Sequence, residues 1–177
     1  MAAYDYEAHI IDIPDYPEPG VVFKDITPLF SDPDAMRHTV EGIVEHFHDA
    51  GITKVVGPEA RGFMIGVPVA LELNAGFVPA RKPGKLPRET YSVSYDLEYG
   101  SDSLEIHKDA IAPNDRVLIV DDLVATGGTA AATGKLIEEI GGTLVGYACI
   151  LELTFLNPRA ELSKTGDQEL FSLVQVK

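Results

Sequence analysis

Short apolar runs alternate with longer segments of helical periodicity along most of this chain. Runs of mostly apolar residues predict strands, and they lie at residues 54–57, 77–80, 117–120, 143–154 and 171–176. Apolar residues at helical spacing predict helices, and they lie between Asp32 and Gly51, from Gly62 to Asn74, and from the Thr129 region to Gly141. This alternation predicts an α/β fold, a mainly parallel sheet flanked by helices, with ligands at the carboxyl ends of the strands. We expect one domain spanning residues 1–177.

Residues 91–107 interrupt the alternation with a different pattern. Tyr91 to Tyr99 alternates apolar and polar side chains, and Leu104 to His107 follows a Gly-Ser-Asp turn, which predicts a β-hairpin. A long two-stranded excursion with little core of its own is a candidate lid over a binding site. The first twenty residues are acidic and contain several prolines, so we expect an arm or a short helix there. Periodicity alone assigns residues 20–26 to a loop.

The stretch from Arg116 to Gly142 concentrates polar residues between a predicted strand and a predicted helix. The apolar run 117–120 ends in two carboxylates, Asp121 and Asp122, and a turn of small residues follows, Ala125-Thr126-Gly127-Gly128-Thr129. Free N–H groups at a helix start, with the two threonine hydroxyls, favour a phosphate dianion. Carboxylates repel phosphate but accept hydrogen bonds from sugar hydroxyls, with or without a cation. The stretch therefore predicts a site for a sugar that carries a phosphate.

Two common phosphate-binding motifs do not fit this stretch. It lacks the G-x-G-x-x-G fingerprint of dinucleotide-binding folds. The P-loop requires four residues between its glycines and then Lys-Ser or Lys-Thr, whereas five residues separate Gly128 from Gly134 and Leu136 follows Lys135. The motif is therefore of another kind.

Composition narrows the classes of partner. With 45% hydrophobic and 24% charged residues, the chain has the composition of a globular protein, and its net charge of −14 argues against a nucleic-acid surface. One cysteine, Cys149, lies in an apolar run and is expected to be a small buried side chain. No secretory leader or membrane-spanning run is apparent, so we expect a cytoplasmic protein. Four of the fourteen basic residues cluster within eight positions, at Arg81, Lys82, Lys85 and Arg88, where an anion could bind.

Several motifs together carry a family resemblance. VLIVDDLVATGGT resembles the phosphoribosyl-pyrophosphate (PRPP) motif of type I phosphoribosyltransferases. PGVVFKDITPLF, GPEARGF, RKPGKLPRET and SYDLEYGSDSLEIHKDA are similar, in this order, to segments of the adenine-specific branch of that family. The resemblance covers nearly the whole chain from about Ile13. It implies the type I phosphoribosyltransferase fold with a small hood, and transfer of 5-phosphoribosyl from PRPP to N9 of adenine, which gives AMP and pyrophosphate in purine salvage.

The resemblance also implies roles for individual residues on the PRPP side. Residues 125–129 would hold the 5-phosphate, and Asp121 and Asp122 the ribose hydroxyls. The diphosphate would be held by four basic side chains: Arg61, Arg81, Lys82 and Lys85. Mg²⁺ would be the cofactor, carried by PRPP rather than by a protein metal site. The family commonly has a non-proline cis peptide in the loop before Arg61, which we place at Glu59–Ala60.

On the base side, the resemblance implies that Val22, Phe23, Lys24 and Tyr99 bind adenine and that Glu98 is the catalytic carboxylate. The family often has arginine where this chain has Lys24, and lysine keeps the charge but lacks the planar fork. The family further implies a homodimer in which basic side chains are shared across the interface.

The sequence alone leaves two other functions open. The same sugar-phosphate motif serves phosphoribosyltransferases that use guanine, xanthine or orotate. A regulator that binds PRPP without catalysis would also keep the motif, although such a protein usually needs a nucleic-acid surface or an added recognition domain.

Overall fold

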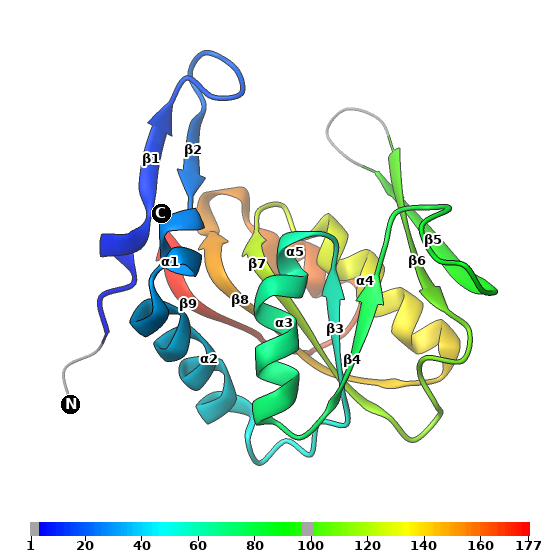
Figure 1. Cartoon of the computed structure of the whole chain (residues 1–177). Coiled ribbons are helices and arrows are strands. Elements are labelled where there is room, and N and C mark those ends of the chain that lie inside the picture. Colours follow the sequence, from blue (N-terminus) through cyan, green and yellow to red (C-terminus); the bar gives the residue numbers. More distant parts are fainter. Residues whose placement is uncertain (1–3, 97–100) are drawn as a thin grey trace.

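The computed structural model describes residues 4–96 and 101–177, and its centre is a parallel sheet in the order β4-β3-β7-β8-β9 (Figure 1). The strands are β3 (Lys54–Pro58), β4 (Gly76–Ala80), β7 (Arg116–Val124), β8 (Thr143–Leu153) and β9 (Leu170–Val176). The predicted mainly parallel α/β fold is therefore confirmed.

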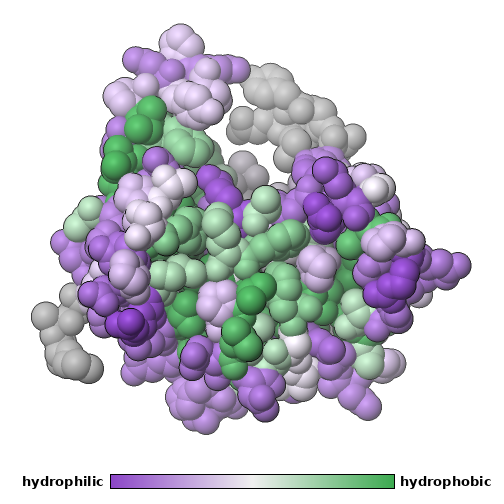
Figure 2. Space-filling view, viewed as in Figure 1, coloured by the Kyte–Doolittle hydropathy of each residue, from purple (hydrophilic) through white to green (hydrophobic). Residues whose placement is uncertain are grey.

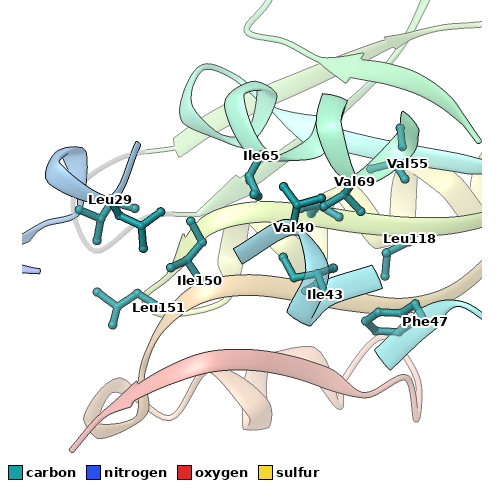
Figure 3. Packing of buried hydrophobic residues seen from close by; sticks show 14 of the residues in the cluster. Leu29, Val40, Ile43, Phe47, Val55, Ile65, Val69, Leu118, Ile150 and Leu151 are labelled. Carbon is teal, nitrogen blue, oxygen red and sulfur yellow. The ribbon is translucent and has the colours of Figure 1, made fainter. Parts of the chain in front are cut away.

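Helices cover both faces of this sheet. One face packs against α1 (Thr27–Ser31), α2 (Pro33–Phe47) and α3 (Arg61–Glu72), and the other against α4 (Gly128–Ile140) and α5 (Pro158–Leu162). Strand β7 serves both cores because successive side chains point to opposite faces. Leu118 and Val120 belong to the α2–α3 core shown in Figure 3, whereas Val117 and Ile119 pack on the α4 side.

Local sequence signals set the starts and ends of the main helices. Asp32 caps α2, because its Oδ1 accepts hydrogen bonds from the N–H groups of Asp34 and Ala35, both at 2.9 Å. Helix α4 ends at Gly141, whose φ of +97° is a left-handed conformation that favours glycine. Both boundaries agree with the sequence prediction. Pro68 lies inside α3, which continues past it to Glu72.

Two antiparallel hairpins stand on opposite sides of the carboxyl edge of the sheet (Figure 1). The pair β5 (Thr90–Asp96) and β6 (Ser101–His107) confirms the predicted hairpin. The 3₁₀ helix η1 (Glu7–His9) agrees with the short helix expected near the N-terminus. The pair β1 (Ile11–Pro14) and β2 (Val22–Asp25) that follows it was not predicted, and it corrects the assignment of residues 20–26 to a loop. All four β1 residues are exposed, so no buried face marks this strand in the sequence.

The order in which successive strands join the parallel sheet reverses between β3 and β7. From β3 the chain passes through α3 to β4 on one side, while β7, β8 and β9 follow on the other side of β3. Open α/β sheets bind ligands in the crevice outside the strand carboxyl ends at such a switch point. Among the residues described, no helix has the length and apolar character that crossing a membrane requires.

Candidate active site

A cleft of about 290 Å³ opens at this switch point. Its lining comes from the end of β3 and the following loop (residues 58–61), from β7 and the following loop (residues 121–130), from Lys82, and from the hairpin residues Tyr95, Asp102 and Leu104. The volume is close to the lower limit of small-molecule sites, which is about 300 Å³. The fold thus brings Arg61, Lys82, Asp121, Asp122 and residues 125–129 together in one cleft.

The two adjacent carboxylates lie within β7 rather than after it. The sequence predicted that this strand ends at Val120, but the pairing with β8 continues to Val124, which corrects the boundary. Asp122 is 4% exposed, and its backbone N–H donates to Asp121 Oδ1 at 2.9 Å. Burial, and then the neighbouring charge of Asp122, raises the pKa of Asp121 well above its usual range. Asp121 therefore keeps its proton to a higher pH than an exposed aspartate.

Arg61 lies beside these carboxylates at the start of α3. Its Nε is 2.8 Å from Asp122 Oδ2, but no N–H of the described residues is aligned for a hydrogen bond to that oxygen. The contact is therefore an ion pair without a directed hydrogen bond. The peptide bond between Glu59 and Ala60 is cis, as the family resemblance implied.

The loop after β7 leads into α4 through a left-handed residue. Gly127 has a φ of +89° and forms the N-cap of α4 without a side-chain hydrogen bond to the helix start. Thr126 Oγ1 lies 3.5 Å from the Gly128 nitrogen, the outer limit for a hydrogen bond. The first N–H groups of α4 are thus available to an anion, which the positive end of the helix dipole also attracts.

The basic segment after β4 divides between two environments. Lys82 lines the cleft and forms an ion pair with Asp102 of β6. Arg81 instead donates from Nε to Glu59 Oε2 at 2.8 Å. Burial would raise the pKa of Glu59, but the hydrogen bonds from Arg81 and the Lys82 backbone outweigh it and lower that pKa. Neither Arg81 nor Lys85 lines the cleft as the described residues form it, so their predicted contacts with diphosphate stay predictions.

The predicted adenine side lies on the β1–β2 hairpin. Phe23 is half-buried against Tyr16, with ring centroids 5.3 Å apart in an edge-to-face arrangement, and Val22 is exposed. The Lys24 amino group lies 2.6 Å from Asp12 Oδ1 on the neighbouring strand. Lys24 thus pairs within the hairpin, and nothing in the structure tests its predicted contact with adenine.

Glu98 and Tyr99 lie outside the residues that the structure describes, so their predicted roles stay predictions. Tyr95 of β5 is a cleft residue that the sequence reasoning did not single out, and its hydroxyl accepts from Thr129 Oγ1 at 3.4 Å. The alternation from Tyr91 could have identified it, because Tyr95 shares a strand face with Val93, which packs on the core.

Comparison with known proteins gives a consistent result. The model of the phosphoribosyl transferase domain matches residues 32–175. The chain is 57% identical over 162 residues to an adenine phosphoribosyltransferase of Serratia proteamaculans, covering 92% of this chain and 81% of that relative. It is 52% identical over 173 residues to that of Synechocystis, covering 97% and 99%.

A solved structure agrees in fold. The adenine phosphoribosyltransferase of Saccharomyces cerevisiae, complexed with D-2,5-dideoxy-2,5-imino-altritol 1,6-bisphosphate and adenine, superposes with a TM-score of 0.89 at 39% identity, covering 96% of each chain. Sequence and structure thus lead to one conclusion, that this chain belongs to the phosphoribosyltransferase family.

Proposed function

We propose that this chain is an adenine phosphoribosyltransferase, which transfers 5-phosphoribosyl from PRPP to N9 of adenine and releases AMP and pyrophosphate. One observation carries the proposal: a pair of carboxylates, an arginine and an uncapped helix start share one cleft at the topological switch point. That set matches the hydroxyls, the diphosphate and the 5-phosphate of PRPP. The relatives named above, which are adenine phosphoribosyltransferases, support adenine as the acceptor.

The 5-phosphate and the ribose would be held by β7 and the following loop. Residues 125–129 would offer backbone N–H groups and the hydroxyls of Thr126 and Thr129 to the phosphate. Asp121 and Asp122 would bind the ribose hydroxyls. Because the pKa of Asp121 is raised, its protonated form can donate a hydrogen bond as well as accept one.

The diphosphate would lie toward Arg61 and Lys82. In the structure these cations pair with Asp122 and Asp102, and the diphosphate would compete for them. Arg81 and Lys85 would also contact the diphosphate, and Arg81 would in addition hold the loop at Glu59 through its hydrogen bond.

Mg²⁺ would enter with the diphosphate. Among the described residues no group of three histidine, cysteine or acidic side chains could form a protein metal site, but the Asp121 and Asp122 oxygens suit a hard cation that substrate oxygens also bind. Bound there, the ion would neutralise negative charge on the leaving pyrophosphate.

The reaction breaks the bond between ribose C1 and the diphosphate oxygen and forms a bond from C1 to adenine N9. Positive charge develops on the ribose as the first bond breaks, so the protein's tasks are alignment, exclusion of water and stabilisation of charge. The β5–β6 hairpin would cover the cleft during this step. The hydroxyl of Tyr95 on β5 already accepts a hydrogen bond from Thr129 in the loop of residues 125–129. Glu98 would hydrogen-bond near purine N7 and assist proton movement from the base.

Adenine would bind under the β1–β2 hairpin. Phe23 would contact the purine face, the Val22 backbone would hydrogen-bond its edge, and Tyr99 would close the pocket. Lys24 would contribute indirectly, since its ion pair with Asp12 ties β2 to β1.

A homodimer is also part of the proposal. Met64, Val67 and Leu71 are exposed on α3 with fractions of 44%, 41% and 74%, and Figure 2 shows apolar side chains grouped over the face where α3 lies. Exposed apolar patches of this kind mark interaction surfaces.

We also propose a cytoplasmic location, which fits the free, buried thiol of Cys149.

The test is a comparison of acceptor bases. The protein is incubated with PRPP and Mg²⁺ and, separately, with adenine, guanine, hypoxanthine, xanthine and orotate, while pyrophosphate release is measured. Release with adenine is expected, at least a hundredfold faster than with the other bases, since unpaired polar groups in a base pocket discriminate by about 10⁴-fold or more. Release with another base would overturn the adenine assignment. PRPP binding without release for any base would indicate the non-catalytic regulator.

A further inference from the structure

A buried carboxylate lies inside the sheet outside the cleft. Glu152 of β8 is 1% exposed, and Arg159 of α5 donates to it twice, from Nε to Oε1 and from Nη2 to Oε2, both at 2.8 Å. Ser172 Oγ and Gln175 Nε2 of β9 donate to Oε2 at 2.7 and 3.3 Å. Burial would raise the pKa of Glu152, but the hydrogen bonds from Arg159 and Ser172 outweigh it and lower that pKa. The pair is therefore ionised at neutral pH, with two-point geometry.

Both ends of this pair adjoin the loop of residues 125–129. In the β7–β8 register Glu152 lies opposite Val124, the last residue of β7 before the loop. Arg159 follows Pro158, the first residue of α5, whose carbonyl oxygen lies 2.9 Å from the position that a Cβ on Gly127 would occupy. The backbone of α5 therefore packs directly against Gly127, the left-handed N-cap residue of α4.

We infer that the Glu152–Arg159 pair is a positioning device for the 5-phosphate loop, which holds α5 so that Pro158 supports Gly127 from behind. The inference rests on the proposed assignment of residues 125–129 to the 5-phosphate. In the described part of the chain, neither Glu152 nor Arg159 lines the cleft, so both act through other residues. Helix α5 has only five residues, and it is anchored by the buried Pro158 and Leu162 together with this ion pair.

The rival explanation is that the pair only stabilises the fold. The two explanations predict changes in different measured quantities. Loss of a merely stabilising pair lowers the melting temperature and leaves substrate affinities of the folded protein unchanged. Loss of a positioning pair weakens PRPP binding more than adenine binding, because the loop moves relative to the Asp121 and Asp122 side chains. The predicted adenine side is linked to the pair through Gln175 of β9, which lines a groove with Asp12 and Lys24.

The experiment measures KM for PRPP, KM for adenine and the melting temperature in Arg159→Gln, Glu152→Gln and the double variant. Arg159→Gln leaves a buried carboxylate without its cation and can fail to fold, whereas the double variant replaces both charges by amides and keeps the inference testable. We expect KM for PRPP to rise about tenfold in the folded variants, since small misplacements of binding groups cost one to two orders of magnitude. KM for adenine should change less than twofold. The double variant should be no worse than either single variant, because the residues act as one unit. Arg159→Lys, which keeps the charge without the fork, should recover part of the affinity.

Ser172→Ala is the matched control, because it removes a hydrogen bond to the same Glu152 carboxylate from β9 without touching α5. It should lower the melting temperature slightly and leave KM for PRPP unchanged. An unchanged KM for PRPP in the folded double variant would overturn the inference, as would an equal rise in the Ser172→Ala variant.

Thr129→Val separates this inference from the assignment on which it rests. If Thr129→Val raises KM for PRPP but the double variant does not, the loop binds the 5-phosphate and only the positioning role fails. If Thr129→Val leaves KM for PRPP unchanged, the 5-phosphate assignment fails and the positioning role fails with it.

Discussion

The Gly127→Ala substitution tests how tightly α5 fixes the 5-phosphate loop, residues 125–129. Gly127 adopts a φ of +89°, and a Cβ there would lie 2.9 Å from the Pro158 oxygen and 3.3 Å from the Glu161 Cβ. The left-handed conformation costs a residue with a Cβ about 1–2 kcal/mol. Carbon and oxygen that approach without a covalent bond are ordinarily about 3.3–3.6 Å apart, so α5 and the loop must separate by roughly half an ångström. Overpacking of this kind costs about 1–3 kcal/mol.

The unfolding free energy should therefore fall by about 2–5 kcal/mol, out of about 5–15 kcal/mol for a typical domain. Gly141→Ala is the matched control at the other end of α4. Gly141 has a φ of +97°, and a Cβ there would meet no described atom within 4 Å apart from those of the adjoining backbone. The control includes the conformational cost and the effect of alanine on the unfolded chain, so the difference between the two variants isolates the contact with α5.

Urea denaturation gives the two free energies, and initial rates of pyrophosphate release give KM for PRPP. We expect Gly127→Ala to lose about 1–3 kcal/mol more than Gly141→Ala and to raise KM for PRPP at least tenfold, while Gly141→Ala keeps KM near the wild-type value. Equal stability losses with equal KM values would refute the reasoning, because the loop would then adjust freely against α5.

Three further predictions concern other parts of the site. Arg61→Met removes the cation from beside the buried Asp122 carboxylate, so urea denaturation should show a loss of about 1–3 kcal/mol together with a higher KM for PRPP; no change in either would contradict the ion-pair assignment. The pKa of Glu152 is lowered by folding, so its stabilising contribution is present above its unfolded pKa of about 4.3 and is lost as pH falls through the folded pKa. The difference in unfolding free energy between wild type and Glu152→Gln should accordingly shrink from pH 6 to pH 3, and a difference independent of pH would count against this account. Phe23→Ala should raise KM for adenine about tenfold, the loss of one buried aromatic contact, with KM for PRPP unchanged; equal changes in both constants would place Phe23 elsewhere.

The central strand, loop and helix could be predicted from sequence because their signals are local. Each signal acts within a few residues: the apolar run before Asp121, the small-residue turn and Gly141. The structure has the predicted strand, loop and helix, and it corrects one boundary, the end of β7. That boundary was wrong because pairing with β8 continues β7 through two polar residues. A strand end is fixed by its neighbours in the sheet, which the local pattern does not reveal.

Contacts between distant segments account for what the sequence could not predict. The β1–β2 hairpin has no buried face on β1 that periodicity could detect. The partners of Arg81, Lys24 and Glu152 are set by the tertiary structure. The basic segment after β4 by itself suggests cations without partners, whereas the Arg81 side chain donates a hydrogen bond to Glu59 in the loop between β3 and α3. Glu152 interrupts an apolar run, and only the fold brings the Arg159 guanidinium to it.

The most direct test of the account compares wild type with the Asp121→Asn/Asp122→Asn double variant. Products formed from adenine and PRPP with Mg²⁺ are separated by chromatography, after circular dichroism has shown that both proteins are folded. We predict that wild type forms AMP and pyrophosphate in equal amounts and that the double variant is slower by a factor of about 100 or more, the usual cost of losing a preorganised polar group that acts on the transition state. Absence of AMP with wild type would contradict the proposed reaction. AMP formation by the double variant at the wild-type rate would show that the reaction does not depend on the carboxylates of this cleft.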